Sequence, residues 1–392
     1  MPKLNPHFSA LKKSYLFQKI AEKTAAHQKK RPQNSLINLG IGDIQKPLIP
    51  SCVEAMREAA VSFAKTETFQ GYPPAEGYSF LRNQIASFEY QKTISPEEIF
   101  ITAGAKNSCV EILQLFSSEN IVAVQDPSYP VYVNGSLFSG MDLVYQPCLE
   151  ENDFIPKLPE KPVDIIYLCS PNNPTGKALD RKALKTWVDY AVKQQSIILF
   201  DGAYEGFITS DAPHSIYSIP GAKKVAIEIR SFSKKGGFTN LRCGYTVIPN
   251  ECQIKGVSLI DLWRKRLHSS FGGVSYPIQK AAEACYFPEG KKELALQMEA
   301  YQEQAAFLKQ KLVALGYTVF GGIDAPYLWW KTPQRIPSWD FFEQILEKGV
   351  ITIPGEGFGP SGEGFVRLST FASIDKLQEA ASRIQKGSLC VI

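Results

Sequence analysis

The apolar residues between positions 98 and 248 fall in short runs separated by segments with helical spacing. The expected strands are residues 99–102, 120–124, 143–145, 164–168, 196–200, 224–229 and 244–248. These runs are apolar on both faces, as in strands that are covered by helices on both sides. The alternation of strands and helices is typical of β-α-β units. The pattern therefore predicts an α/β domain with a mostly parallel, seven-stranded sheet flanked by helices.

The rest of the chain predicts further helices and a second, smaller α/β unit. Helical spacing is found at residues 10–28, 51–64, 80–90, 110–116, 181–192, 252–267, 277–286 and 291–315, and Gly316 is expected to end the last of these helices. Residues 36–39 read as a short strand that ends in glycines. The smaller unit is predicted to contain strands at 317–320, 327–330, 350–353 and 364–369 and helices at 338–348 and 374–386.

The length of the chain supports a division into domains. Its 392 residues exceed the roughly 250–300 at which a single core stops growing. We expect residues 1–35 to form an N-terminal arm and part of the small domain, residues 36–288 a large cofactor-binding domain, and residues 289–392 a small C-terminal domain.

Composition and charge exclude several classes of partner. The net charge of +4 is mild, and the basic clusters are short and lack interleaved aromatic residues, so we expect no nucleic acid partner. No run approaches the roughly 20 apolar residues that span a bilayer, so we expect no membrane association. The eight cysteines are scattered without a C-x-x-C motif, which favours free thiols in a reducing cytoplasm. We expect no metal site.

The segment after the sixth predicted strand contains candidate chemistry. Ser231 and Ser233 precede Lys234, and Arg242 follows eight residues later. A lysine amine can form a Schiff base with a cofactor aldehyde, while serine and arginine suit a phosphate. Pyridoxal phosphate is the cofactor that requires both. Taken alone, this motif fits a solvated surface lysine about equally well.

Other strand ends carry residues that suit the same cofactor, because ligands of open parallel sheets bind at the carboxyl ends of the strands. Asp201 ends an apolar strand, and such a semi-buried carboxylate needs a partner, for which a protonated pyridine nitrogen is suitable. Tyr204 could reach the ring hydroxyl group. Asn173 lies in a rigid Pro- and Gly-rich turn and could donate to the ring oxygen. Tyr129 could stack on the ring or be a plain turn tyrosine.

Two glycine-containing segments complete the pattern. Gly104-Ala105-Lys106 follows the predicted strand at 99–102, where a helix N-terminus would favour a phosphate, although it is not a Walker loop. The loop of residues 68–78 is rich in aromatic residues, glycine and proline, and long loops of this kind are more often functional than structural.

These motifs resemble a known superfamily over nearly the whole chain. Asn173-Pro174-Thr175-Gly176, Asp201-x-x-Tyr204 and Ser231-x-Ser233-Lys234 with Arg242, in this order, are similar to the aspartate-aminotransferase-like (fold type I, class I/II) pyridoxal-phosphate enzymes. Within that superfamily, the segments that look most like the LL-diaminopimelate aminotransferase family are residues 39–43, 71–72, 104–106, 126–132 and 364–369. Lys106 is the most telling of these, because many relatives carry a different residue there.

The resemblance implies a role for each matching residue. Lys234 would carry the cofactor, Asp201 would pair with its pyridine nitrogen, and Tyr204 would contact its ring oxygen; these three are the expected catalytic residues. Asn173 would also bind the ring oxygen, and Tyr129 would stack on the ring. The residues expected around the phosphate are Ala105, Lys106, Ser231, Ser233 and Arg242, with Tyr72 from a partner subunit.

The resemblance also implies a substrate site. Arg367 would bind the substrate α-carboxylate bidentately, a task for which lysine is a poor replacement. Tyr15, Gly42 and Lys106 would line the end of the pocket that receives the substrate side chain. Tyr129 and Asn173 would border the substrate as well as the cofactor.

The implied reaction is a reversible transamination by a homodimer with shared active sites. LL-2,6-diaminopimelate and 2-oxoglutarate would give tetrahydrodipicolinate and glutamate, in the biosynthesis of lysine and peptidoglycan precursors. The alternatives on the same fold are a broad aromatic or aspartate-type aminotransferase and a β-lyase. A different class is a cofactor-binding regulatory protein without turnover, but the chain leaves no room for an added DNA-binding module.

Two positions depart from the pattern of the diaminopimelate family. Gly272 stands where the family usually has asparagine, and Ala75 stands where it usually has glutamate, with Glu76 as the nearest substitute. In the family, side chains at these two positions contact the cofactor or the distal end of the substrate. The sequence therefore leaves open how wide a range of substrates the protein accepts.

Overall fold

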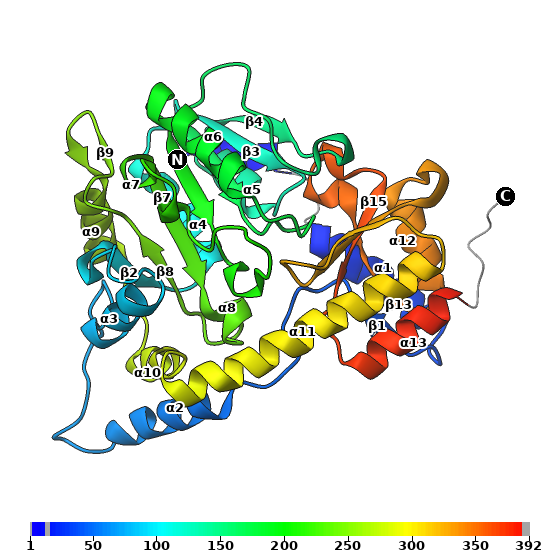
Figure 1. Ribbon diagram of the computed structural model, residues 1–392, viewed down its shortest axis with the longest axis horizontal. Coiled ribbons are helices and arrows are strands. Elements are labelled where there is room, and N and C mark those ends of the chain that lie inside the picture. The colour runs from blue at the N-terminus through cyan, green and yellow to red at the C-terminus, as the bar shows by residue number, and fades with distance from the viewer. Residues whose placement is uncertain (1, 12–15, 386–392) are drawn as a thin grey trace.

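The computed structural model describes residues 2–11 and 16–385, and its larger sheet contains every strand predicted between residues 98 and 248 (Figure 1). These strands are β2 (Ile99–Thr102), β3 (Ile121–Asp126), β4 (Asp142–Pro147), β5 (Ile165–Cys169), β6 (Ile197–Asp201), β7 (Ala226–Ser231) and β8 (Gly244–Val247). Their order is β2-β8-β7-β6-β5-β3-β4, and only β8 runs antiparallel to its neighbours. The mostly parallel, seven-stranded sheet is confirmed.

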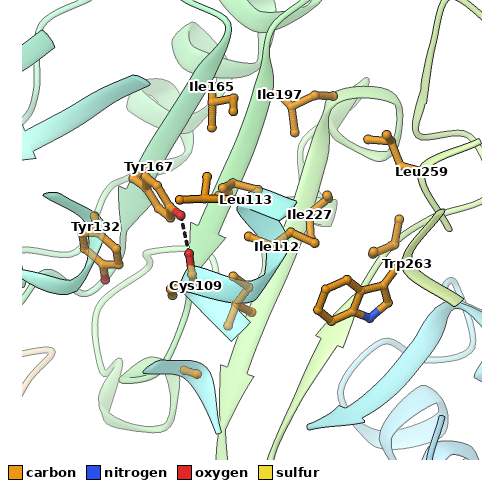
Figure 2. Close-up of a cluster of buried hydrophobic side chains, with 14 of the residues drawn as sticks. Cys109, Ile112, Leu113, Tyr132, Ile165, Tyr167, Ile197, Ile227, Leu259 and Trp263 are labelled. Carbon is orange, nitrogen blue, oxygen red and sulfur yellow. Dashed lines mark hydrogen bonds between the residues drawn. The ribbon is translucent and has the colours of Figure 1, made fainter. Parts of the chain in front are cut away.

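Both faces of this sheet are covered, which explains the continuous apolar strands. On one face, Ile197 belongs to a buried cluster that also contains Trp263 of α9 (Leu259–Ser270) and Ile112 and Leu113, which follow α4 (Ala105–Glu111), as Figure 2 shows. On the other face, the neighbouring Ile198 packs against Trp187 of α6 (Arg181–Gln194). Asp180 caps α6, because its side chain accepts a hydrogen bond from the Ala183 backbone N–H at 2.7 Å.

The C-terminal part of the chain builds a second, antiparallel sheet in the order β11-β12-β15-β14. Its strands are β11 (Val319–Gly321), β12 (Tyr327–Lys331), β14 (Ile353–Pro354) and β15 (Phe365–Ser369), and the helices nearby are α12 (Ser338–Glu347) and α13 (Ile374–Gln385). The strand predicted at 350–353 is divided, because β13 (Val350–Ile351) pairs instead with β1 (Ile37–Asn38). The division into domains stays a prediction. Because β1 pairs with β13 of the C-terminal part, we expect the boundary predicted between residues 35 and 36 to lie a few residues later.

The long helix α11 (Pro288–Ala314) connects the two parts and runs along one side of the molecule (Figure 1). Its residue Leu294 packs in a core of the large domain, whereas Leu308 and Leu312 pack in the core of the small domain. Gly316, with φ +86°, follows its end as predicted. α11 thus fixes the smaller sheet beside the larger one.

Three predicted helices begin elsewhere. The segment predicted as a helix from 252 starts with the hairpin β9 (Gln253–Ile254) and β10 (Val257–Ser258), and α9 begins only at Leu259. The helix predicted at 110–116 begins earlier, as α4, and ends in a 3₁₀ turn. The helix predicted at 10–28 is a 3₁₀ turn at Pro6–Ala10 followed by α1 (Leu16–Lys30), while residues 12–15 lie outside the described part.

The remaining helices agree with the predictions or add to them. They are α2 (Pro50–Ser62), α3 (Ser79–Phe88), α5 (Val131–Phe138), α7 (Ala222–Val225), α8 (Phe232–Lys235) and α10 (Tyr276–Ala284). α5 was not predicted, and it matters for the site. No helix within the described ranges is both long and apolar enough to cross a membrane.

Candidate active site

A cavity of about 500 Å³ lies at the carboxyl ends of the parallel strands, where β12 and β15 of the smaller sheet approach them. It brings together most of the predicted site residues. Those that line it are Gly42, Ala105, Lys106, Tyr129, Asn173, Asp201, Tyr204, Ser231, Ser233, Lys234, Arg242 and Arg367. Tyr72 does not line the cavity and is 99% exposed. Tyr15 lies outside the described residues.

Lys234 stands in the short helix α8, directly after β7. Ser231 caps this helix by accepting a hydrogen bond from the Ser233 backbone N–H at 3.1 Å. The Lys234 ammonium group donates to the carbonyl oxygen of Gly42. Burial lowers the pKa of Lys234 to about 8, and the charges of Arg367 and Arg242 act in the same direction. A substantial fraction of this amine is therefore neutral, and thus nucleophilic, in mildly alkaline solution.

Asp201 ends β6 as a buried carboxylate. Tyr132 donates to its Oδ2 atom at 2.8 Å, and the Ala203 backbone N–H donates to Oδ1 at 2.9 Å. Burial raises the pKa of Asp201, and these hydrogen bonds oppose the rise. Within the part of the chain that the structure describes, no lysine, arginine or histidine forms an ion pair with it. The charge of Arg230 also lowers the pKa of Asp201. The carboxylate is therefore held in place without an ion-pair partner in the described chain, which suits a cationic ring nitrogen.

Arg367 is the corresponding buried cation. Its Nη1 donates to the Asn173 side-chain oxygen and its Nη2 to the Gly40 carbonyl, both at 2.6 Å. Its Nε is buried without a hydrogen-bond partner among the described residues. A buried guanidinium group with an unsatisfied N–H favours a carboxylate ligand. Because the Asn173 oxygen faces Arg367, the amide hydrogens of Asn173 are left to donate to a ring oxygen.

Another group of lining residues supplies donors suited to a phosphate. Arg242 lies 3.4 Å from the Ser233 hydroxyl oxygen, and Ser231 lies beside it on the cavity wall. At Gly104, φ is +98° and a Cβ atom would stand 2.7 Å from an Arg242 nitrogen, so glycine allows the guanidinium group to approach. The amine, the carboxylate and this group of phosphate donors together fit pyridoxal phosphate.

Two tyrosines of the cavity wall have contacts that sequence reasoning missed. Tyr132 lies in the unpredicted helix α5 and donates to Asp201. Tyr327 begins β12, and its hydroxyl oxygen lies 2.6 Å from that of Tyr204. Tyr327 begins a strand whose other residues are mostly apolar, so in the sequence it resembles a core residue. Its hydroxyl group was the only feature of the sequence that could have indicated a role in the site.

An ion pair behind the cavity fixes two of the strand-end segments together. Lys235, next to Lys234, lies 3.3 Å from an oxygen of Glu205, next to Tyr204, and 2.8 Å from an oxygen of Glu89. Burial lowers the pKa of Lys235, but the two carboxylates outweigh it and the net shift is upward. The pair therefore stabilises the relative position of the segments that carry Lys234 and Tyr204.

We predict that Lys235→Met lowers the free energy of unfolding by about 1–3 kcal/mol, because it leaves the largely buried carboxylates of Glu89 and Glu205 with less compensating charge. Urea denaturation followed by fluorescence measures this change. The matched control is Lys185→Met, which removes an exposed pair with Asp189 and should cost at most about 0.5 kcal/mol. Equal losses in the two variants would contradict a structural role for Lys235.

Comparison with known proteins agrees with this geometry. The family model described as "Aminotransferase class I and II" matches residues 34–384. The chain belongs to this family. It is 45% identical to the LL-diaminopimelate aminotransferase of Methanosphaera stadtmanae, with 98% of each chain covered. It is 46% identical to that of Bacteroides thetaiotaomicron, covering 98% of this chain and 99% of the relative.

A solved structure supports the same assignment. The L,L-diaminopimelate aminotransferase of Chlamydomonas reinhardtii superposes with a TM-score of 0.94 at 42% identity, with 98% of each chain covered. The predictions of an aspartate-aminotransferase-like fold and of a transaminase are thus confirmed.

The two departures from the diaminopimelate pattern occupy different surroundings. Gly272 is exposed, and a Cβ atom added there would meet nothing within 4 Å. Ala75 is partly buried against the core. The carboxylate of Glu76 lies 3.5 Å from Arg82 and 3.2 Å from Arg264, so it already has two cationic partners in its own chain. Glu76 is therefore a poor substitute for a glutamate at position 75.

Proposed function

We propose that this enzyme transfers an amino group from LL-2,6-diaminopimelate to 2-oxoglutarate, giving tetrahydrodipicolinate and glutamate in a reversible reaction. The observation that carries the proposal is its likeness, over almost the full length, to relatives named LL-diaminopimelate aminotransferase. The reaction would serve the synthesis of lysine and peptidoglycan precursors.

We propose pyridoxal phosphate as the cofactor, since the buried groups of the cavity fit it. When bound, it supplies an aldehyde that bonds to amines and a ring that takes up electrons from the substrate Cα. Asp201 would keep the ring nitrogen protonated, while Asn173 and Tyr204 would donate to the ring oxygen and Tyr129 would pack on the ring. The residues proposed to hold the phosphate are Ala105, Lys106, Ser231, Ser233 and Arg242, with Tyr72 of a partner subunit.

The chain's own residues would then bind the substrate and move its proton. Arg367 would hold the α-carboxylate, because its buried guanidinium group has an N–H without a partner in the described chain. The Nζ atom of Lys234 would carry the proton away from the substrate Cα, a role that its lowered pKa favours. Tyr15, Gly42 and Lys106 would border the distal part of the substrate.

The proposed role of Lys234 predicts a pH dependence for cofactor capture. Only the neutral amine attacks an aldehyde, and the pKa of Lys234 is lowered to about 8. The rate of pyridoxal phosphate capture by the cofactor-free protein should therefore rise roughly tenfold per pH unit below that value and level off above it. Stopped-flow absorbance between pH 6 and 10 measures this. A rate that keeps rising tenfold per pH unit up to pH 10 would contradict the lowered pKa.

A second candidate is a broader aminotransferase, which the departures at Ala75 and Gly272 favour because both remove a polar side chain that the diaminopimelate family usually has. A β-lyase is the other alternative on the same fold. Glutamate formation from 2-oxoglutarate distinguishes these readings when LL-diaminopimelate, aspartate and phenylalanine are offered as separate donors. The main proposal predicts glutamate with diaminopimelate and little with the others. Comparable rates with aspartate or phenylalanine, or release of pyruvate and ammonia from a β-substituted amino acid, would overturn it.

We propose that the active enzyme is a homodimer. The loop that carries Phe69 and Tyr72 presents large apolar side chains, 63% and 99% exposed, which a second copy would cover. Tyr72 would then reach the phosphate of the partner's site. Sedimentation analysis should give twice the mass of the chain, and a monomer with full activity would exclude shared sites.

We propose the cytoplasm as the place of action. The seven cysteines in the described part of the chain are all buried free thiols, which suits a reducing compartment.

A further inference from the structure

A pair of tyrosine hydroxyl groups joins the two sheets inside the cavity. Tyr327, 1% exposed, begins β12 of the smaller sheet, and Tyr204 follows β6 of the larger one. Their oxygens lie 2.6 Å apart, and their rings are 5.1 Å apart in an edge-on arrangement. Tyr204 is proposed to contact the ring oxygen of the cofactor, so Tyr327 lies one hydrogen bond behind it.

Tyr327 also contacts the segments that hold the two cations of the site. It pairs with Ser369 of β15, which places Arg367, two residues earlier, diagonally on the same face. The Arg367 guanidinium carbon lies 4.4 Å from the centre of the Tyr327 ring. A Cβ atom on Gly42 would collide with the Tyr327 hydroxyl oxygen, and the Gly42 carbonyl accepts from Lys234. Tyr327 is therefore in contact with the proposed carboxylate site and with the segment that positions the lysine.

The number of hydroxyl hydrogens determines which tyrosine donates in the hydrogen bond between Tyr204 and Tyr327. Each tyrosine hydroxyl group has one hydrogen to donate. If Tyr204 gives its hydrogen to the cofactor ring oxygen, Tyr327 must donate to Tyr204. The positive charge of Arg367 beside the Tyr327 ring makes that hydroxyl group a stronger donor, and hydrogen bonds in such a chain reinforce one another.

The charges around the pair agree with this direction. Burial raises the pKa of Tyr327, while the positive charge of Arg367 opposes the rise. The titratable and charged groups that face the two hydroxyl groups are Arg367 of β15, Cys169 of β5, Asp43 of the loop after β1, and Lys234 of α8.

We propose that Tyr327 is a positioning residue that transmits the binding of a carboxylate at Arg367 to the ring oxygen of the cofactor through Tyr204. A bound carboxylate neutralises Arg367, which weakens the donation from Tyr327 to Tyr204 and then from Tyr204 to the ring oxygen. The ring oxygen becomes more basic, so the pH midpoint of the bound cofactor's absorbance rises when substrate binds. This route is separate from the direct contact between Arg367 and Asn173, and it rests on the proposed cofactor.

The test is a pH titration of the absorbance of the holoenzyme, without and with saturating glutarate, a dicarboxylate that cannot be transaminated. Glutarate should raise the midpoint of the unaltered enzyme. In Tyr327→Phe, the midpoint without glutarate should rise by about half a pH unit or more, and the shift caused by glutarate should fall below half of its original size. Tyr317→Phe is the matched control, since its ring packs on Trp330 away from the cavity, and it should change neither value.

A second pair of variants tests the route itself. If Tyr327 acts through Tyr204, Tyr204→Phe and the Tyr204→Phe/Tyr327→Phe double variant should have the same midpoint. Additive shifts, or an unchanged midpoint and glutarate response in Tyr327→Phe, would overturn the inference. Should Tyr327→Phe fail to fold, a full glutarate shift in Tyr204→Phe would overturn it equally. A protein that develops no cofactor absorbance at all would contradict the proposed function instead.

Discussion

Lys234→Ala is expected to lower the turnover number by about four orders of magnitude or more, the largest loss that we predict. The substitution removes the amine proposed both to carry the cofactor and to move the proton from the substrate Cα, and general acid–base catalysis alone is worth about 10²–10⁴-fold. The helix α8 and the Gly42 carbonyl hold this amine at the cavity. A small movement of the backbone would not bring another amine to the same place. Glutamate formation under saturating substrates measures the loss.

The neighbouring lysine provides a control for this experiment. Lys235 directs its ammonium group to Glu89 and Glu205, not into the cavity, so Lys235→Met should retain most of the turnover despite its lower stability. Steady-state activity that survives in purified Lys234→Ala would contradict the proposed role of Lys234 in the reaction.

Arg367→Lys is expected to reduce kcat/KM by about 10²–10³-fold, mainly through a higher KM. The guanidinium group donates to Asn173 and to Gly40 and keeps an N–H for a ligand, whereas an ammonium group cannot reproduce this planar fork. Initial rates over a range of substrate concentrations separate KM from kcat.

The control for Arg367 is Arg383→Lys, on the outer helix α13. Arg383 bonds to Ser35 and Glu379 far from the cavity, so the kinetic constants should change less than about twofold. An unchanged kcat/KM in Arg367→Lys would remove Arg367 from the carboxylate site.

The larger sheet could be predicted because its strands, apart from the more exposed edge strand β4, are buried on both faces and so leave continuous apolar runs. The residues that end or follow these strands, such as Asp201 and Asn173, then fall at one edge, where parallel sheets bind ligands. The structure does bring them into one cavity. Their roles in catalysis stay predictions until they are measured.

Other features depend on contacts that a pattern of residues does not contain. The strand predicted at 350–353 is divided because its first half pairs with β1, far away in the chain. The hairpin before α9 turns at Lys255 and Gly256, both with positive φ, although its residues also fit a helical spacing. Tyr327 reads as a core residue of the small domain until the position of Tyr204 is known. These differences arise from tertiary packing between distant segments.

The central claim is that this chain exchanges amino groups with LL-diaminopimelate. Single-turnover absorbance spectroscopy of the cofactor-loaded protein tests it most directly, with LL-diaminopimelate, glutamate, aspartate and phenylalanine offered separately. The account predicts rapid loss of the aldehyde absorbance with diaminopimelate and glutamate only. Comparable loss with aspartate or phenylalanine, or none with diaminopimelate, would contradict it.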